Sequence, residues 1–331
     1  MAVVGRTARR RLWREIDDNR RSAILCPWPS QGNADSHRFG VWALSSSRYP
    51  EGERMASHQL AKAASFRALH VDGMLLLPNA WDSGSAAMIA AAGATVIATT
   101  SAGMSWALGR PDGQGLTRDE MVAAIARIVS TVGDLPVTVD IEGGYGLAPA
   151  DVADTVAQVI AAGAVGANIE DSQAPGGPLF ETAAQVERLR AARAAATNAG
   201  LADFVINART DVFLFGIGEP DGRLEDVLAR GGAYAEAGAD CLFVPGLLDL
   251  DTLAKLTDQS PLPINVMAGP GAPDIGALAS VGVRRVSVGS AVAQAAYSVA
   301  RRAAAEVLSR GTYGRLEGAD DFGVMNGIFT R

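Results

Sequence analysis

Residues 136–171 read PVTVDIEGGYGLAPADVADTVAQVIAAGAVGANIED. Two β-branched apolar runs, PVTVDIE and GANIED, enclose a segment at 150–163 whose apolar residues follow a helical spacing. Gly163, near the end of that segment, can supply the left-handed residue that ends a helix. A strand, a helix and a second strand in this order predict a parallel pair joined by a right-handed crossover.

The same alternation continues over most of the chain, with Ala-rich helical segments such as 182–200 between short apolar runs. Eight such units predict an α/β fold, a single (β/α)₈ TIM barrel. An open doubly wound sheet is the alternative, but PNAWDSGSA follows the first run, where that fold has a Gly-rich dinucleotide turn. The runs are MLLLP (74–78), TVIATT (95–100), PVTVDIE (136–142), GANIED (166–171), FVINARTD (204–211), DCLFVPG (240–246), PINVM (263–267) and RVSVG (285–289).

The first 54 residues do not follow this rhythm. They are rich in Arg and show no sustained helical or strand period. We therefore expect residues 1–54 to be a disordered or non-native N-terminal extension. The barrel domain is expected to span 55–315, beginning with an amphipathic helix at Met55, and 316–331 to form a C-terminal tail.

Charge and cysteine content exclude several classes of function. The net charge is −7, and because residues 1–54 hold ten Arg and six acids (+4), the remainder carries −11. An acidic body predicts no nucleic-acid or membrane partner. The uncharged stretch 83–109 is dominated by small residues, which argues against a membrane span. Two distant cysteines, Cys26 and Cys241, favour a cytoplasmic protein without disulfides.

Carboxylates gather at two neighbouring strand ends, where the reactive groups of such barrels lie. Asp140 and Glu142 follow one strand, and Glu170 and Asp171 follow the next. A period of two places Asp140 and Glu142 on the same side of the strand. This crowding is costly unless a cation compensates, and oxygen ligands favour Mg²⁺, with Mn²⁺ possible in its place.

Missing residue types narrow the chemistry. All three His precede the first barrel strand, which argues against a His base or a zinc site. Neither of the two Lys stands at a strand end, so a Schiff-base aldolase is excluded. Each acid alone could instead cap a helix, Arg209 could be an ordinary ion-pair partner, and Tyr145 is most simply a packing residue. The coincidence of several acids with Arg209 and Asn265 at successive strand ends favours a site.

At these residues the sequence resembles the isocitrate lyase / phosphoenolpyruvate mutase superfamily. The resemblance covers roughly residues 58–315, and its motifs occur in the expected order at the strand ends. They are TTSAG (99–103), PDG (111–113), VDIEGGYG (139–146), GANIEDS (166–172), NARTD (207–211), AGADCLFVPG (237–246) and PINVM (263–267).

The resemblance implies roles for particular residues. Asp140, Glu142 and Glu170 would surround Mg²⁺, largely through its waters, and Asp112 would lie farther out. The backbone at Ser101, Ala102 and Gly103 would donate hydrogen bonds to the substrate. Arg209 would pair with a carboxylate and help to stabilise negative charge. Arg209 and Glu170 are therefore the candidate catalytic residues by this resemblance. Asn265 would line the substrate pocket.

The resemblance further implies a Mg²⁺-dependent lyase that cleaves a C–C bond beside a carboxylate in a small 2-oxo or 2-hydroxy acid, through a pyruvate-like enolate. A 2-methylisocitrate-type cleavage and an oxaloacetate-type decarboxylation are both conceivable. Alternatives are a C–P bond enzyme, such as a phosphonopyruvate hydrolase or mutase, and a catalytically silent carboxylate-binding barrel. A homo-oligomer, dimer or tetramer, with exchanged C-terminal helices is also implied.

Two departures from the superfamily pattern keep the reaction open. Lyase members carry a KRCGH-type loop after the fourth strand, with a Cys acid/base, and the mutase branch has Lys and Asn there. This chain reads EDSQAPGGPLFE (170–181), without Cys, Lys or His. Lyase members also have Glu after the Phe of the sixth strand, whereas Phe243 precedes Val-Pro-Gly. The loop 172–181 is expected to act as a mobile gate.

Overall fold

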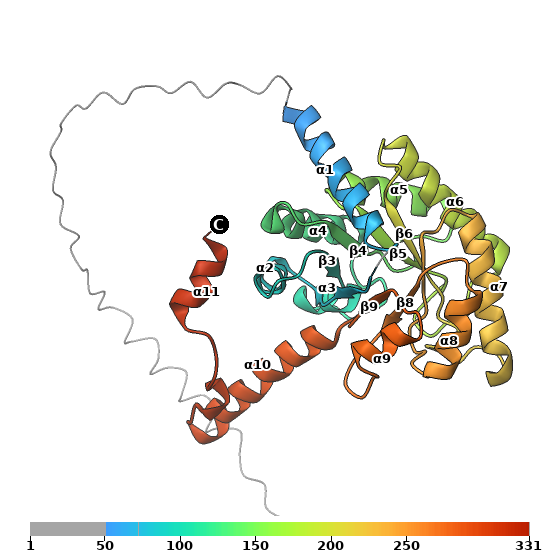
Figure 1. The fold of residues 1–331 in the computed structure, drawn as a ribbon. Helices are drawn as coiled ribbons and strands as arrows, with labels where there is room; N and C mark the ends of the chain where they lie inside the picture. The colour runs from blue at the N-terminus through green and yellow to red at the C-terminus, as the bar shows by residue number, and fades with distance from the viewer. Residues whose placement is uncertain (1–50, 72, 331) are drawn as a thin grey trace, which may run out of the picture. The chain divides into compact units, whose positions relative to one another are not determined.

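The computed structural model describes residues 51–71 and 73–330, so positions 1–50 of the predicted extension lie outside the described residues. Nine short strands in this part form one parallel sheet, in the order β1-β9-β8-β7-β6-β5-β4-β3-β2. The sheet curls into a nearly closed barrel, which confirms the predicted TIM-barrel fold (Figure 1). The strands are β1 (Leu75–Leu77), β2 (Asn79–Ala80), β3 (Ile97–Thr99), β4 (Val137–Asp140), β5 (Gly166–Glu170), β6 (Val205–Arg209), β7 (Cys241–Phe243), β8 (Ile264–Met267) and β9 (Arg285–Ser287).

The nine described segments fill eight barrel positions because the first position is interrupted at Pro78. β1 precedes this proline and pairs with β9, whereas β2 follows it and pairs with β3. Proline has no backbone N–H to donate, so the ladder of hydrogen bonds breaks there. The interrupted strand joins the two ends of the sheet and closes the barrel.

Helices between the strands cover the outside of the barrel (Figure 1). Local signals begin several of them, since Thr117 and Glu120 form a capping box and Asp249 and Asp274 cap two later helices. The helices are α1 (Glu51–Ala68), α2 (Ser83–Ala91), α3 (Ser101–Ala107), α4 (Arg118–Val132), α5 (Pro149–Ala161), α6 (Thr182–Asn198), α7 (Arg223–Glu236), α8 (Leu250–Gln259), α9 (Ile275–Ser280), α10 (Ala291–Arg310) and α11 (Phe322–Phe329).

The two faces of each strand meet different surroundings. On β4, Val137 and Val139 join the hydrophobic core between sheet and helices, while Thr138 and Asp140 take the opposite side. The barrel interior is therefore polar beneath its mouth, and its side chains hold one another through hydrogen bonds. They are Asn168, Asn207, Asn265, Arg285 and Ser287.

Helix α1 closes the bottom of the barrel. Gln59 donates two hydrogen bonds from its side-chain amide to the carbonyls of Ile160 (2.8 Å) and Ala164 (3.0 Å). Phe66 is fully buried, and a Cβ atom added at Gly166 would lie 2.8 Å from its ring. A larger residue at position 166 would clash with Phe66, so α1 packs closely against the start of β5 because that position is glycine.

The predicted domain boundaries differ slightly from the described elements. Helix α1 begins at Glu51, four residues before the expected start at Met55, and the predicted tail 316–331 contains α11. The boundaries themselves stay a prediction. No helix in the described part of the chain has the length and apolar character to cross a lipid bilayer.

His70, just after α1, is held in one tautomer at the base of the barrel. Its Nδ1 lies 2.9 Å from the carbonyl oxygen of Phe66, to which it donates, so Nε2 accepts from Arg285 Nη1 at 3.2 Å. Burial and the Arg285 charge lower the pKa of His70 to about 4. The folded protein thus keeps this imidazole neutral, whereas the unfolded chain protonates it near pH 6.5.

This difference predicts a loss of stability in mild acid. The unfolded state binds the proton more tightly than the folded state. The contribution of His70 to the free energy of unfolding is therefore fully present above about pH 6.5 and decreases as the pH falls toward 4. The free energy of unfolding is measured by urea denaturation at pH 7 and at pH 5. Its decrease between the two pH values should be roughly 1–2 kcal/mol larger for wild type than for His70→Gln. His58→Gln, at a half-exposed site, is the control and should behave as wild type. Equal losses in His70→Gln and wild type would contradict the assignment.

Candidate active site

Three predicted acids meet at the carboxyl ends of β4 and β5. Asp140 ends β4, Glu142 follows it, and Glu170 ends β5. Asp140 and Glu142 are only 9% and 3% exposed. Burial, and then repulsion from Asp140, raises the pKa of Glu142 to about 7. Burial raises the pKa of Glu170 to about 8, although Arg209 acts in the opposite direction. The structure therefore places these three carboxylates at or just after the ends of two neighbouring strands, as the sequence predicts.

Glu142 is held by an unusual backbone. Among the described residues, three non-glycine positions have positive φ: Gln114 (57°), Glu142 (51°) and Tyr145 (59°). All three meet here, since the Glu142 carboxylate accepts from the Gln114 backbone amide and from the Tyr145 hydroxyl at 3.3 Å. Such strain is typical of functional sites. Tyr145 packs against the core, as expected, but its hydroxyl also belongs to the site.

Asp140 is fixed by the start of α3. Its Oδ2 accepts from the backbone amide (3.2 Å) and hydroxyl (2.9 Å) of Ser101, and its Oδ1 accepts from the Glu142 amide at 3.2 Å. Ala102 and Gly103 continue the same first helical turn. A Cβ atom at Gly103 would lie 2.6 Å from that of Trp81, so this approach requires glycine.

Asp112 lies at the rim of the site. Burial raises its pKa, while a hydrogen bond from the Gly113 amide acts in the opposite direction. Its charge is close enough to Glu142 to raise the pKa of that residue as well. The structure thus places Asp112 near the other acids, and its place farther from the metal stays a prediction.

Arg209 is the cation of the site. Its Nη1 lies 2.8 Å from Glu170 Oε2, and its Nε and Nη2 lie 2.6 and 3.1 Å from the two oxygens of Asp211. Burial alone would lower the pKa of Arg209, but Glu170 and Asp211 together raise it. In the sequence, Asp211 is one of many polar residues at strand ends, and nothing singles it out. The structure shows that it contacts two nitrogens of Arg209.

A buried layer behind Arg209 supports this arrangement. Asp171 accepts from the Asp211 amide at 3.0 Å, from the Tyr234 hydroxyl at 2.9 Å and from Arg230 Nη1 at 3.2 Å. The Ser172 hydroxyl donates to Asp211 Oδ2 at 2.6 Å. Arg230 and Tyr234 lie one helical turn apart on α7. Sequence analysis missed them because a spacing on a helix does not reveal which strand end the helix will face.

The predicted gate 172–181 lies against the rim. Its ends are tied by an isolated bridge between Ser172 and Leu179, and the Phe180 amide donates to the Asp171 carbonyl at 2.7 Å. A Cβ atom at Gly113 would lie 2.2 Å from Pro175, so the segment packs closely on the loop that carries Asp112. Its opening and closing stay a prediction.

Asn265 lies beneath the mouth. It is fully buried, its Oδ1 accepts from Asn207, and its Nδ2 donates to the carbonyls of Val266 and Arg285. The side-chain amide of Asn265 is therefore hydrogen-bonded to other groups of the protein. The structure therefore places Asn265 on the floor of the site, and its expected contact with substrate stays a prediction.

Comparison with known proteins assigns the chain to a family. Residues 66–308, well over half of the chain, match phosphoenolpyruvate phosphomutase. The chain belongs to the phosphoenolpyruvate phosphomutase family.

Individual relatives agree. An uncharacterized protein of Mycobacterium tuberculosis is 39% identical over 244 residues, which cover 73% of this chain and 88% of the relative. A solved structure from Burkholderia cenocepacia J2315, provisionally assigned as a lyase/mutase, has a TM-score of 0.77 at 39% identity, covering 83% and 98% of the two chains. The solved 2,3-dimethylmalate lyase, described as a PEP mutase/isocitrate lyase superfamily member, has a TM-score of 0.71 at 28% identity, covering 81% and 94%. The predicted superfamily and the expectation of an enzyme of its lyase and mutase type are confirmed.

For a phosphoenolpyruvate phosphomutase family member, the donor set fits a hard divalent cation. The mouth offers carboxylate oxygens from Asp140, Glu142 and Glu170, and burial, with a smaller contribution from neighbouring acids, raises the pKa of the two glutamates. Within the described residues, no three acidic, Cys or His side chains are grouped closely enough to hold an ion directly. Which residues bind Mg²⁺ stays a prediction.

The carboxylate assignment is tested by removing one acid at a time. Asp140→Ala and Glu142→Ala should each weaken Mg²⁺-dependent binding of oxalate about 10- to 100-fold, since ligands and their supporting groups contribute that much to a metal site. Isothermal titration calorimetry measures the affinity, and circular dichroism checks the fold. Asp154→Ala, an exposed acid on α5, is the matched control. Unchanged oxalate binding in both site variants would refute the assignment.

Proposed function

We propose that this protein is a Mg²⁺-dependent lyase that cleaves a C–C bond beside a carboxylate in a small 2-oxo or 2-hydroxy acid, through a pyruvate-like enolate. The observation that supports it is the convergence of Asp140, Glu142 and Glu170 with Arg209 at adjacent strand ends. Membership in a family whose relatives include 2,3-dimethylmalate lyase supports the type of reaction. Mn²⁺ has the same ligand preference and could replace Mg²⁺.

Each group of the chain has a part in this chemistry. A bound divalent cation would polarise the 2-oxo group and offset negative charge. The first-turn amides of α3, residues 101–103, point their N–H groups toward the mouth end of that helix. The Ser101 amide already donates to Asp140, so those of Ala102 and Gly103 are the ones that can donate to a negatively charged oxygen. Asp211 holds two nitrogens of Arg209, which fixes the guanidinium and directs Nη1 toward the carboxylates. Arg209 can thereby pair with the substrate carboxylate.

Cleavage of a C–P bond is the second candidate, favoured by the match to phosphoenolpyruvate phosphomutase. The same acids and Arg209 would serve a phosphonopyruvate hydrolase or mutase. A carboxylate-binding barrel without turnover is a third candidate, because the segment 170–181 has no Cys, Lys or His to act as the loop acid/base.

A substrate panel separates these functions. With Mg²⁺ present, 2-oxo and 2-hydroxy di- and tricarboxylates and phosphonopyruvate are assayed for pyruvate, glyoxylate and phosphate. A C–C lyase releases pyruvate or glyoxylate without phosphate, and chelation by EDTA should lower the rate at least 100-fold, given the usual contribution of electrostatic stabilisation. Phosphate release, or isomerisation without release, indicates C–P chemistry instead. Mg²⁺-dependent binding without any product would indicate the silent barrel.

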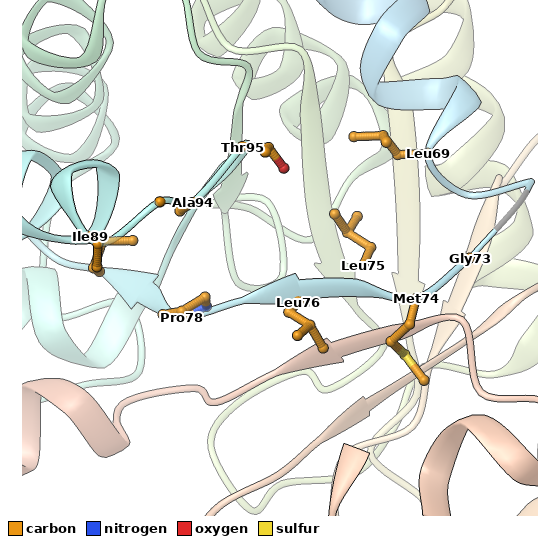
Figure 2. A pocket seen from close by; sticks show the side chains of 11 residues that line it. Leu69, Gly73, Met74, Leu75, Leu76, Pro78, Ile89, Ala94 and Thr95 are labelled. Atoms are coloured by element: carbon orange, nitrogen blue, oxygen red, sulfur yellow. The ribbon is translucent and has the colours of Figure 1, made fainter. Parts of the chain in front are cut away.

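We further propose a homo-oligomer, dimer or tetramer, in which α10 packs on a second copy. In the described chain α10 leaves the barrel after β9 (Figure 1), and only Ala293 and Ala303 of its twenty residues are buried. It exposes Val299 and Leu308, among other apolar side chains. The outer face of β1, next to β9, carries an apolar groove of about 490 Å³ in which Leu76 is 48% exposed (Figure 2). Packing between copies would cover these surfaces.

Size-exclusion chromatography with light scattering tests the oligomer. Wild type should run as a dimer or tetramer at about 10 µM, and the double substitution Val299→Asp with Leu308→Asp should at least halve the mass, since buried unpaired charges oppose association. Leu60→Asp, an exposed leucine on α1, is the control and should keep the wild-type mass. A monomeric wild type would refute the proposal.

A cytoplasmic location is the last part of the proposal. Cys241 is buried and free in the structure, and burial raises its thiol pKa to about 12. A thiol in that state is unreactive and packs as a small apolar side chain. This use of cysteine is compatible with a reducing compartment.

A further inference from the structure

Two buried polar side chains of α6, Gln185 and Arg188, lie between the acids of the mouth and the gate 172–181. They stand three residues apart, on one face of the helix, and are 0% and 1% exposed. Arg188 donates from Nε to Gln185 Oε1 at 3.0 Å. Burying a guanidinium and an amide is unfavourable unless both are hydrogen-bonded, so their remaining partners show what the pair does.

Arg188 holds the turn that follows Glu142. Its terminal nitrogens donate to three carbonyls of the turn 143–147, which are those of Gly143, Gly146 (2.9 Å from Nη1) and Leu147 (2.6 Å from Nη1). Glu142, at the start of this turn, has a left-handed backbone with φ 51°. Such a backbone persists only where its surroundings fix it. The guanidinium is one such constraint, because it presents several N–H donors in a rigid plane.

Gln185 holds the second strand end. Its Nε2 donates to the backbone carbonyl of Glu170, the last residue of β5, at 3.2 Å. One face of α6 therefore reaches the main chain of Glu170 directly, and that of Glu142 through the turn behind it. Because these hydrogen bonds are made to backbone carbonyls, they position the two glutamates without occupying their carboxylates.

Arg188 also contacts the gate. Its guanidinium carbon lies 4.2 Å from the centre of the Phe180 ring, and Phe180 is 9% exposed near the end of the segment 172–181. A guanidinium over an aromatic face is attracted by the ring. The same planar group is thus stacked on the gate and hydrogen-bonded to the turn. A shift of Phe180 would therefore reorient the donors that hold the backbone beside Glu142.

We infer that Arg188, together with Gln185, is a positioning residue that couples the gate to the glutamates of the mouth. With Phe180 packed on the guanidinium, the turn 143–147 is held and Glu142 keeps the backbone from which it would bind the cation. Binding in the mouth favours the packed gate in return, since a coupling between two sites acts in both directions. This inference rests on the proposed function and adds a means of regulating the same site.

Substitutions on the two sides of the contact test the coupling. Oxalate is titrated by calorimetry into the full chain with Mg²⁺, and circular dichroism checks each fold. Arg188→Lys keeps the charge but loses the planar donors, and should weaken oxalate binding about tenfold. Phe180→Leu removes the ring and keeps an apolar side chain, and should weaken binding about threefold. The double variant should bind no more weakly than Arg188→Lys alone, because Phe180 acts through Arg188.

Hydrogen exchange separates this role from a general loss of stability. At Mg²⁺ and oxalate concentrations that saturate each protein, the ligands should slow exchange of the gate amides in wild type. This protection should be about tenfold smaller in Arg188→Lys, and it should also decrease in Phe180→Leu. Arg190→Lys, at an exposed position of the same helix, is the matched control and should keep the wild-type affinity and protection.

Three outcomes would decide against the inference or its basis. Wild-type gate protection in Arg188→Lys would overturn it, and so would losses of affinity that multiply in the double variant. If Arg188→Lys does not fold, wild-type affinity and protection in Phe180→Leu would overturn it equally. A wild type that does not bind oxalate in the presence of Mg²⁺ would instead refute the proposed function on which the inference rests.

Discussion

The burial of several carboxyl groups in one mouth is the constraint on which this structure depends. Asp140, Glu142 and Glu170 share one mouth, and burial together with their mutual charge pushes the pKa of Glu142 to about 7 and that of Glu170 to about 8. A fold gains nothing by such crowding unless the site binds something positive. The donors around these acids are therefore best understood as means of holding them in place without neutralising them.

Those donors come mainly from the backbone. Asp140 is held by the Ser101 and Glu142 amides, and Glu142 by the amide of Gln114. Backbone N–H groups stabilise a carboxylate without filling the mouth with a second side chain. The hydroxyls of Ser101 and Tyr145 also donate to these acids. Arg209 is the charged donor, and it is shared between Glu170 and Asp211. The mouth therefore holds more carboxyl groups than cations.

The barrel supports this site from below and from behind. Beneath it, a hydrogen-bonded layer that includes Asn207 and Asn265 replaces the apolar filling common in such barrels. Behind it, Asp171 connects Asp211 to Tyr234 and Arg230 on α7. A polar interior of this kind is favourable where its members are paired, and among the described residues Asn207 Oδ1 and Arg285 Nε have no partner. The contacts of Asp171 tie the geometry of the mouth to the packing of α7.

The amino-acid order alone determined the barrel and the positions of its acids. Alternating strand and helix patterns leave few topologies open, and a period of two places Asp140 and Glu142 on one side of a strand. Tertiary structure decided the rest. The left-handed backbone of Glu142, its contact with Gln114 28 residues away, and the pairing of Asp171 with Arg230 59 residues away depend on how loops and helices pack. Local patterns report which side of an element a residue takes, but they carry no information about the partner that another element brings to it.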